Sequence, residues 1–502
     1  PFRLQWAQSK MEKTTETMIA RPNSPAAGNR LSSFNDQAVD QALLQSRQTL
    51  FPAQGWPRCG EVPETMVSEP LVPHFPEVGE ADGALTFHEA DGALTGPQAV
   101  FNLANIVVGV GVLSVPYALK QSGYSALLII AFVIYVTSTT GKWIGSALEM
   151  AAECKEARDV VPSARDFGFL ARIVFGEKGS VFINVVTVLE IWLALVTFMV
   201  MNGVNARILW PSIESWVAVL LSGAVGMACC FVPPRCFAYL SLVSTVSMLL
   251  AFVAMLRSAL MKSDWSNPYN HFGMKAVLQL YNVPRSVGII IFCFAGHPCF
   301  PAVKTSMKSP TSWATCIDVS FLIAFAYYGG FGMLGYLVFG FEVGETVTQN
   351  ITTIRGALFW QNVAALCFLV KVQLTMPLLQ GAIMVALWPP EAGRPAWPLP
   401  RVALLFGVAV VTVLVAVAFA DAVAVLASLS GSLFVMTTSV LFPAVVHMCL
   451  SWRFRSAKQR LRTTRGEEMF ARFRYCVVIA FGAIFAILGT VLAVADLTAP
   501  RA

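Results

Sequence analysis

The sequence predicts an all-α polytopic membrane protein with about eleven transmembrane helices, and three observations predict it. The 502 residues are 56% hydrophobic and only 13% charged, which lies outside the composition of soluble domains. Apolar runs of about 20 residues, the length that crosses ~30 Å of hydrocarbon, recur from residue 98 onward. Two of these runs are interrupted near their middle by Gly and Pro residues.

The apolar runs give the predicted spans, numbered in chain order. They lie near residues 98–119, 124–149, 180–205, 215–232, 237–257, 284–303, 314–339, 356–387, 402–420, 422–447 and 475–495. The net charge of +6 comes from basic residues in the loops between spans, where insertion topology accounts for them. A lipid bilayer is therefore the expected environment, and no nucleic-acid partner is expected.

Residues 1–96 differ in composition from the rest of the chain. They are rich in Pro, Ser, Gln and acidic residues and hold no 20-residue apolar run, so they cannot bury a core. We expect a disordered tail there. The remaining expected parts are a ten-helix core over 97–447, a basic loop over 448–474, and the eleventh span with a short C-terminus over 475–502.

The distribution of Lys and Arg predicts the orientation. The loops after the even-numbered spans hold far more Lys and Arg than the loops after the odd-numbered spans. The basic side is expected to be cytosolic, which places the N-terminal tail in the cytosol and the C-terminus on the opposite side. The sequon Asn350-Ile351-Thr352 falls in a non-cytosolic loop, so Asn350 is a glycosylation candidate.

The first interruption lies in span one, which reads FNLANIVVGVGVLSVPYAL from Phe101 to Leu119. Each of Gly109 and Gly111 costs about 1 kcal/mol relative to Ala in a helix. An opened backbone inside a membrane is tolerated only against protein or a water-filled cavity. A half-helix that begins near Val112 would point its N–H groups at that cavity and favour a carboxylate. The alternative is that these glycines only let helices pack closely.

The second interruption lies in span six, which reads VGIIIFCFAGHPCFPAVKTSMKSP from Val287 to Pro310. Gly296, His297 and Pro298 interrupt its apolar helix. Breaks at corresponding positions, in spans one and six, are typical of two inverted five-helix repeats with a substrate site between them. Two matching interruptions favour the cavity over simple packing.

Three segments resemble the amino acid/auxin permease family. They are the two interrupted spans and the loop VPSARDFGFLARIVFG from Val161 to Gly176. Within the family, residues 97–495 are most similar to the vacuolar neutral amino acid transporters and the vesicular inhibitory amino acid transporter. The resemblance implies a LeuT-type fold of ten core helices plus one extra helix, and proton-coupled symport or antiport of amino acids. It also implies the membrane of an acidic organelle (vacuole, lysosome or vesicle) or the plasma membrane.

The resemblance also places the substrate region. Its residues are Asn105, Gly109, Val110, Gly111, Leu113 and Ser114 in span one, and Phe294, Ala295, Gly296 and His297 in span six. Half-helix N–H groups near residues 112–114 would hold the substrate carboxylate, and carbonyls freed around residues 292–296 would hold its ammonium. Spans three and eight would complete the side-chain pocket.

Three ionisable residues inside spans are candidates for proton coupling or gating, because such residues are expensive in lipid and usually face a pathway or a partner. Glu190 lies in span three and Lys371 in span eight. Either could relay a proton, or the two could form a buried pair. Lys371 could also place its ammonium where sodium-coupled relatives of the fold hold a cation. His297 could act as a proton switch or as a neutral hydrogen-bond donor.

Enzymatic and metal-binding functions lack support in the sequence. We find no nucleophile elbow, HExxH motif, P-loop or paired intramembrane carboxylates, so no catalytic residue is expected. The Cys and His residues show no ligand spacing, so neither a metal site nor a cofactor is expected. The sequence therefore predicts a secondary transporter of small neutral amino acids driven by protons, with sodium less favoured. An amino acid sensor of the same fold with little flux is the alternative.

Overall fold

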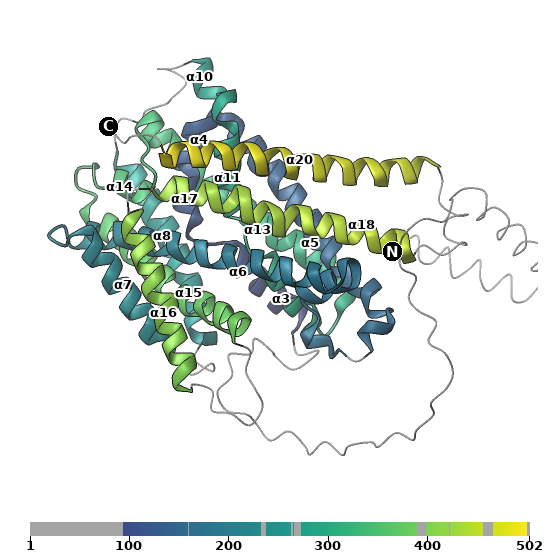
Figure 1. The fold of residues 1–502 in the computed structure, drawn as a ribbon. Coiled ribbons are helices and arrows are strands. Elements are labelled where there is room, and N and C mark those ends of the chain that lie inside the picture. The colour runs from purple at the N-terminus through teal and green to yellow at the C-terminus, as the bar shows by residue number, and fades with distance from the viewer. Residues whose placement is uncertain are drawn as a thin grey trace, which may run out of the picture. The chain divides into compact units, whose positions relative to one another are not determined.

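The computed structural model describes residues 94–158, 160–231, 237–262, 265, 273–388, 398–420, 422–454 and 465–498. Within these ranges the regular secondary structure is helical, and the β-type pairing there is an isolated bridge between Leu94 and Met307 (Figure 1). The predicted all-α class is confirmed. The predicted tail lies almost entirely outside the described residues.

Helices of very different lengths make up the fold. With the 3-10 turns η1 and η7 included and the other short 3-10 turns left out, they are α3 Gly96–Val107, η1 Val110–Ser114, α4 Val115–Ser122, α5 Ala126–Ala152, α6 Phe167–Leu209, α7 Ser215–Cys229, α8 Phe237–Met261, α10 Met274–Val277, α11 Val283–Phe292, η7 His297–Cys299, α12 Phe300–Thr305, α13 Trp313–Phe339, α14 Val347–Ile351, α15 Leu358–Leu387, α16 Leu399–Ala418, α17 Val423–Leu429, η10 Ser430–Leu441, α18 Phe442–Phe454 and α20 Arg465–Thr498.

Among the described residues, nine helical stretches are long and apolar enough to cross a membrane, and α7 is a shorter apolar helix. One stretch, Val110–Ala152, has 43 residues and takes in the end of predicted span one and all of predicted span two. A straight helix of that length would measure about 65 Å, twice the hydrocarbon thickness. The chain turns back instead at Gly123, whose φ of 76° suits glycine. The polytopic class is confirmed, and the total of eleven spans stays a prediction.

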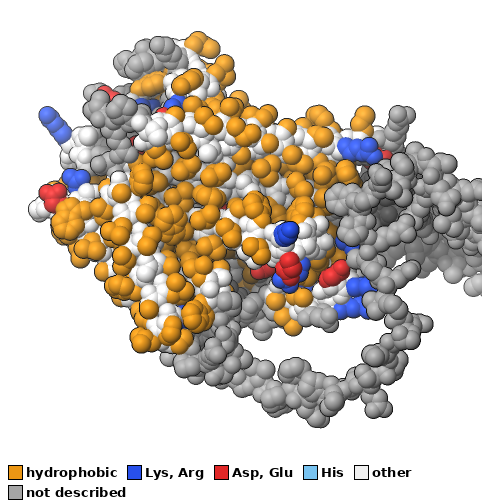
Figure 2. Space-filling view, viewed as in Figure 1, with side chains coloured by type: hydrophobic (Ala, Val, Ile, Leu, Met, Phe, Trp, Pro, Cys, Tyr) orange, Lys and Arg blue, Asp and Glu red, His pale blue; other side chains and the backbone are white. Residues whose placement is uncertain are grey.

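Large apolar side chains cover most of the face in Figure 2. Exposed examples lie along several of the long helices, with exposed fractions of 75% for Leu128, 64% for Leu414 and 64% for Ile487. A soluble monomer rarely exposes apolar surface on this scale. These side chains are the lipid-facing part of the helices.

Two helices are each broken near the middle. The first broken helix consists of α3, η1 and α4, and the second consists of α11, η7 and α12. Both interruptions lie where they were predicted. The second half of the first broken helix was expected to begin near Val112, but it starts as a 3-10 turn at Val110 and becomes α-helical at Val115.

Glycines let α13 approach the first broken helix. A Cβ atom added to Gly332 would lie 2.6 Å from Val115 Cγ1, and one added to Gly335 would lie 2.6 Å from Pro116 Cγ. Small residues at helix contacts allow this close packing in membranes, where van der Waals contact replaces the hydrophobic effect as the driving force. Span seven therefore packs directly on α4.

The end of α12 is tied to two neighbouring elements. The buried Lys304 donates from Nζ to Glu149 Oε1 of α5 at 2.6 Å. Leu94 donates its N–H to Ser306 O, and Lys308 donates its N–H to Leu94 O, both at 2.8 Å. The segment that leads into α3 is thereby paired with the residues that follow α12.

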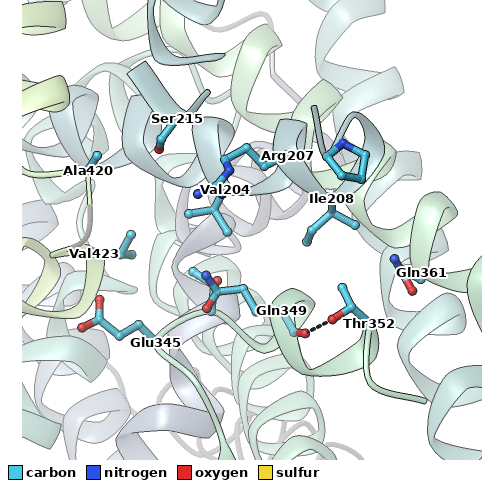
Figure 3. A pocket seen from close by; sticks show the side chains of 12 residues that line it. Val204, Arg207, Ile208, Ser215, Glu345, Gln349, Thr352, Gln361, Ala420 and Val423 are labelled. Carbon is cyan, nitrogen blue, oxygen red and sulfur yellow. Dashed lines mark hydrogen bonds between the residues drawn. The ribbon is translucent and has the colours of Figure 1, made fainter. Parts of the chain in front are cut away.

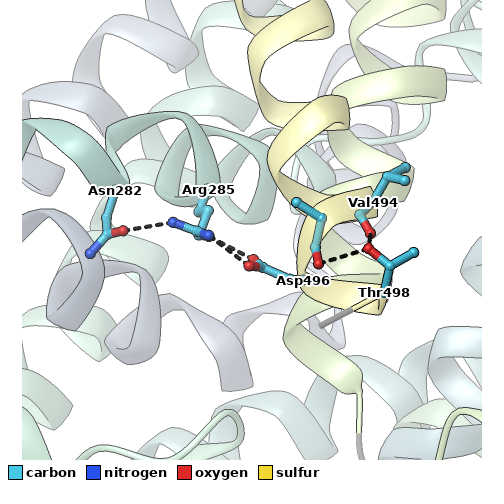
Figure 4. Close-up of polar contacts among 6 residues, drawn as sticks. Asn282, Arg285, Val494, Asp496 and Thr498 are labelled. Carbon is cyan, nitrogen blue, oxygen red and sulfur yellow. Dashed lines mark hydrogen bonds and ion pairs between the residues drawn. The ribbon is translucent and has the colours of Figure 1, made fainter. Parts of the chain in front are cut away.

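The last helix, α20, packs on α11, α17 and η10. An ion pair fixes it to the second broken helix, because Arg285 donates from Nε and Nη2 to the two carboxylate oxygens of Asp496 at 2.6 Å each (Figure 4). Such bidentate pairs add geometric specificity to the attraction. Arg285 also donates to Asn282 Oδ1 at 2.8 Å, so its guanidinium is held from both sides.

Candidate functional site

The first break is an extended stretch of main chain. Val108 (φ −85°, ψ 94°) and Gly109 (φ −118°, ψ −178°) separate α3 from η1. These angles are accessible to any residue, so the backbone itself does not require glycine at 109. A Cβ atom added to Gly109 would meet no atom within 4 Å, which shows open space beside this residue.

A tyrosine from α13 satisfies the polar groups that the first break frees. Gly109 donates its N–H to the buried Tyr328 hydroxyl at 2.9 Å. That oxygen also lies 2.8 Å from Val107 O and 3.1 Å from Cys293 O. A hydroxyl has one hydrogen to donate, so the two carbonyls share it. Tyr328 thus links the two broken helices through a single atom.

The second break is a tight turn followed by a buried histidine. The residue between α11 and η7 that sets the turn is Gly296, with φ 127° and ψ 0°. Its added Cβ would lie 2.4 Å from Ile106 Cγ2 of α3, and the added Cβ of Gly111 would lie 2.9 Å from Cys293 Sγ. The two breaks therefore lie against each other, and both contacts depend on the absence of a side chain.

The structure brings the sequence-predicted substrate residues together at these two breaks. Val110, Gly111, Leu113, Ser114, Phe294 and His297 are buried, whereas Asn105, Gly109, Ala295 and Gly296 are partly exposed. The Ser114 hydroxyl is buried without a hydrogen-bond partner, and such a group costs about 1–3 kcal/mol when left unpaired. Phe294 stacks on Phe321 and meets Tyr328 edge-on.

Asn105 faces spans five and eight. Its Oδ1 accepts hydrogen bonds from Lys371 Nζ and from Thr245 Oγ1, both at 3.2 Å. Lys371 is 4% exposed, and no carboxylate among the described residues lies within ion-pair distance of it. Asn105, Thr245 and Lys371 thus form a cluster in which a buried ammonium is held by a neutral amide.

Glu190 does not pair with Lys371, so the buried pair considered from the sequence is not formed. The carboxylate of Glu190 is 3% exposed and accepts a hydrogen bond at 2.6 Å from Thr438 Oγ1. Thr438 lies in η10, a π-helical stretch of 12 residues. π-Helical turns occur frequently at functional sites.

A hydrogen-bond chain connects the neighbour of Thr438 to the second break. Thr140 of α5 donates to Ser439 O at 2.7 Å, and its oxygen lies 3.3 Å from His297 Nε2. His297 Nε2 also lies 3.0 Å from Thr137 O. Because a carbonyl only accepts, Nε2 carries the hydrogen, an assignment made from the partners. His297 Nδ1 is buried without a partner, which fits a neutral ring.

Four residues that hold these groups in place were not predicted from the sequence: Tyr328, Thr140, Thr245 and Thr438. Hydroxyl side chains are frequent in apolar helices, where they bond to the preceding turn, and Thr438 also does so. Their cross-helix partners depend on which helices are adjacent. The one available signal was the Tyr327-Tyr328 pair inside an apolar run, because a buried tyrosine hydroxyl normally needs a partner.

The glycosylation candidate is engaged within its own loop. Asn350 donates from Nδ2 to Glu342 O at 2.9 Å and accepts at Oδ1 from Gly344 N–H at 2.8 Å. A glycan on Nδ2 would have to coexist with the first of these bonds. Modification at Asn350 stays a prediction.

Comparison with known proteins places this geometry among membrane transporters. The profile of the family described as "Transmembrane amino acid transporter protein" matches residues 93–488. Amino acid transporter AVT1D of Arabidopsis thaliana is 25% identical over 413 residues, which are 80% of this chain and 70% of the relative. The vesicular inhibitory amino acid transporter of Xenopus laevis is 26% identical over 379 residues, which are 72% of this chain and 71% of the relative.

The fold has a solved counterpart in the crystal structure of MhsT in complex with L-phenylalanine. The two structures superpose with a TM-score of 0.54 at 12% sequence identity, over 81% of this chain and 100% of MhsT. At this identity the likeness concerns the fold alone. It is the LeuT-type fold, in agreement with the sequence prediction.

Proposed function

Because this chain belongs to the transmembrane amino acid transporter family, we propose that it is a secondary active transporter of small, neutral amino acids, driven by protons through alternating access. The observation that carries the proposal is the meeting of the two broken helices at Tyr328. Discontinuous helices of this kind form the substrate sites of many secondary transporters.

The substrate site that we propose lies beside Gly109. The space there holds no protein atom within 4 Å of the added Cβ position, and the buried Ser114 hydroxyl lacks a partner. The N–H groups at the start of η1 would receive the carboxylate, and the carbonyls at Phe292–Gly296 would receive the ammonium. None of the predicted residues of this region carries a charge, since His297 is neutral, and this favours a neutral substrate.

The coupling ion that we propose is the proton. Lys371 places an ammonium beside Asn105, and this ammonium would stand where sodium-coupled relatives of the fold hold a cation. Buried lysines act as general bases in enzymes, and Lys371 would exchange its proton as the surrounding helices open. Glu190 is a second candidate carrier, since its carboxylate contacts Thr438, whose neighbour Ser439 is bonded to Thr140 and through it to His297.

Uptake of labelled amino acids into proteoliposomes under an imposed pH gradient tests this function. Gradient-driven accumulation of neutral amino acids is expected, and stoichiometric binding without accumulation would instead identify a sensor.

The Lys371→Ala variant should change the pH dependence of uptake more than it changes substrate choice. Lys262→Ala is the matched control, because that lysine follows the end of α8 and donates to Val338 O. A pH profile unchanged by Lys371→Ala would remove this lysine from the mechanism.

We also propose an organelle membrane, with the N-terminus in the cytosol. The Lys and Arg distribution supports this orientation, and one of the relatives is named as a vesicular transporter. Protease protection of an N-terminal tag in sealed vesicles would test the orientation. A tag that is cleaved from outside isolated organelles is expected, and a protected tag would reverse the topology.

A further inference from the structure

A pocket separate from the two breaks lies where several helices end. Its volume is about 530 Å³, within the range of pockets that bind small molecules. The end of α6, the start of α7, the segment around α14 and the ends of α15–α17 contribute to its wall. Its polar lining residues are Arg207, Ser215, Glu345, Thr346, Gln349, Thr352 and Gln361. By the predicted topology it opens on the non-cytosolic side.

The Arg207 side chain and the Thr346 hydroxyl lack a partner among the described residues. The exposed side chain of Arg207 lines the pocket and makes no hydrogen bond or ion pair with any residue in the described part of the chain. Thr346 is 1% exposed, and its buried hydroxyl also has no partner. The guanidinium of Arg207 is therefore open to a molecule in the pocket, whereas the Thr346 hydroxyl is closed off from it.

The pocket carries opposite charges on different elements. Arg207 and Ser215 come from the α6–α7 wall, and Glu345 and Gln349 come from the segment around α14 that faces it (Figure 3). Glu345 is held in place because its Oε2 accepts the N–H of Ala424 at 2.9 Å. Apolar residues, among them Val204, Ile208 and Val423, form the rest of the lining.

This combination matches the chemistry of a free amino acid. A guanidinium is suited to bind a carboxylate through two parallel hydrogen bonds, a carboxylate binds an ammonium, and an apolar wall accepts a neutral side chain. We propose that the pocket is a second amino acid site, in which Arg207 binds the substrate carboxylate and Glu345 its ammonium. The inference rests on the proposed function, since it takes the transported class of molecule as its ligand.

The substrate would bind in this pocket before or after it binds at the two breaks. An amino acid held at the non-cytosolic mouth raises the local concentration at the breaks, or it receives the molecule that the breaks release. Neutralising either charge should therefore weaken binding in the pocket and leave the main-chain site at Gly109 intact.

Equilibrium binding to the purified full chain in lipid nanodiscs tests the proposal. The probe is an equimolar mixture of tritium-labelled L-amino acids, measured by scintillation proximity. The wild-type chain should bind about two molecules, and Gly111→Val, which obstructs the breaks, should bind about one. Arg207→Gln and Glu345→Gln should each bind about one, because Gln at 345 keeps an acceptor for Ala424 N–H while it removes the charge.

Controls and contrary outcomes separate this proposal from the function on which it rests. Arg355→Gln and Glu342→Gln remove charges near the same surface but outside the pocket lining, and both should bind as the wild type does. Wild-type stoichiometry in Arg207→Gln, or a single site in the wild type, overturns the second site even where gradient-driven uptake is normal. Two sites without accumulation in proteoliposomes would overturn transport and keep the pocket. If Gly111→Val fails to fold, the Arg207 and Glu345 variants still decide the question.

Discussion

The two broken helices interrupt their main chain in opposite ways. At the first break the backbone is extended and Gly109 faces open space, while a distant tyrosine supplies its hydrogen bond. At the second break the backbone turns through a positive φ at Gly296, which is packed against Ile106. The first break therefore provides room, and the second provides a rigid wall. Glycine is therefore suited to the two breaks for different physical reasons: open space at Gly109, and a positive φ with close packing at Gly296.

The largest effect is expected from a substitution at the rigid break. Gly296→Ala should reduce uptake by more than about tenfold and lower the melting temperature of the purified protein. A non-glycine residue in this backbone region costs on the order of 1–3 kcal/mol, and the new Cβ would also clash with Ile106. Gly330→Ala is the matched control, since its added Cβ would meet only Phe252 at 3.7 Å. Equal uptake in both variants would contradict a special role for Gly296.

The next largest effect separates the glycines of the first break. Gly111→Val should abolish transport because its side chain would collide with Cys293 and Phe292. Gly109→Ala should leave the melting temperature unchanged and weaken substrate binding by about tenfold, or 1.4 kcal/mol, because the methyl group enters the open space. Uptake kinetics and thermal melts measure the two effects. Unaltered uptake kinetics in Gly109→Ala would mean that the substrate does not lie beside residue 109.

An intermediate effect is expected from the atom that joins the two breaks. Tyr328→Phe removes the hydroxyl that serves Gly109, Val107 and Cys293, and unsatisfied buried groups cost about 1–3 kcal/mol. Both stability and uptake should fall. Tyr327→Phe is the control, since that hydroxyl bonds Met248 O and neither break. If the two variants lose equal stability and retain equal uptake, Tyr328 does not link the breaks.

The smallest effect is expected at His297. The ring is neutral in the structure, with Nε2 bonded to Thr137 O and Nδ1 unpartnered. His297→Gln keeps an N–H donor, so we expect uptake within a few-fold of wild type and a pH profile of the same shape. Uptake measured across the pH range checks this. A profile that becomes flat would make His297 a proton carrier and would move the coupling from Lys371 to the second break.

The predicted positions of the breaks followed from residue types with strong local consequences. Gly and Pro disrupt a helix wherever they stand, so Gly109, Gly111 and Gly296 could be recognised in the chain. The sequence also identified Lys371 and Glu190 by their cost in lipid. The hydrogen-bond partners of Lys371 and Glu190 could not be predicted in the same way. Whether Lys371 meets Glu190 or Asn105 depends on the rotation of span eight against spans one and three, and the sequence of one helix does not contain that angle.

The sequence by itself determined that the chain is a helical membrane protein of this family and that two of its helices open, because hydrophobic length and helix-breaking residues act locally. Only the tertiary structure decided how the openings are completed. Tyr328, Thr140, Thr245 and Thr438 come from helices far along the chain, and the pocket around Arg207 and Glu345 is assembled from the ends of several helices. Hydrogen bonds and cavities of this kind arise when helices pack, so their partners cannot be identified before the packing is known.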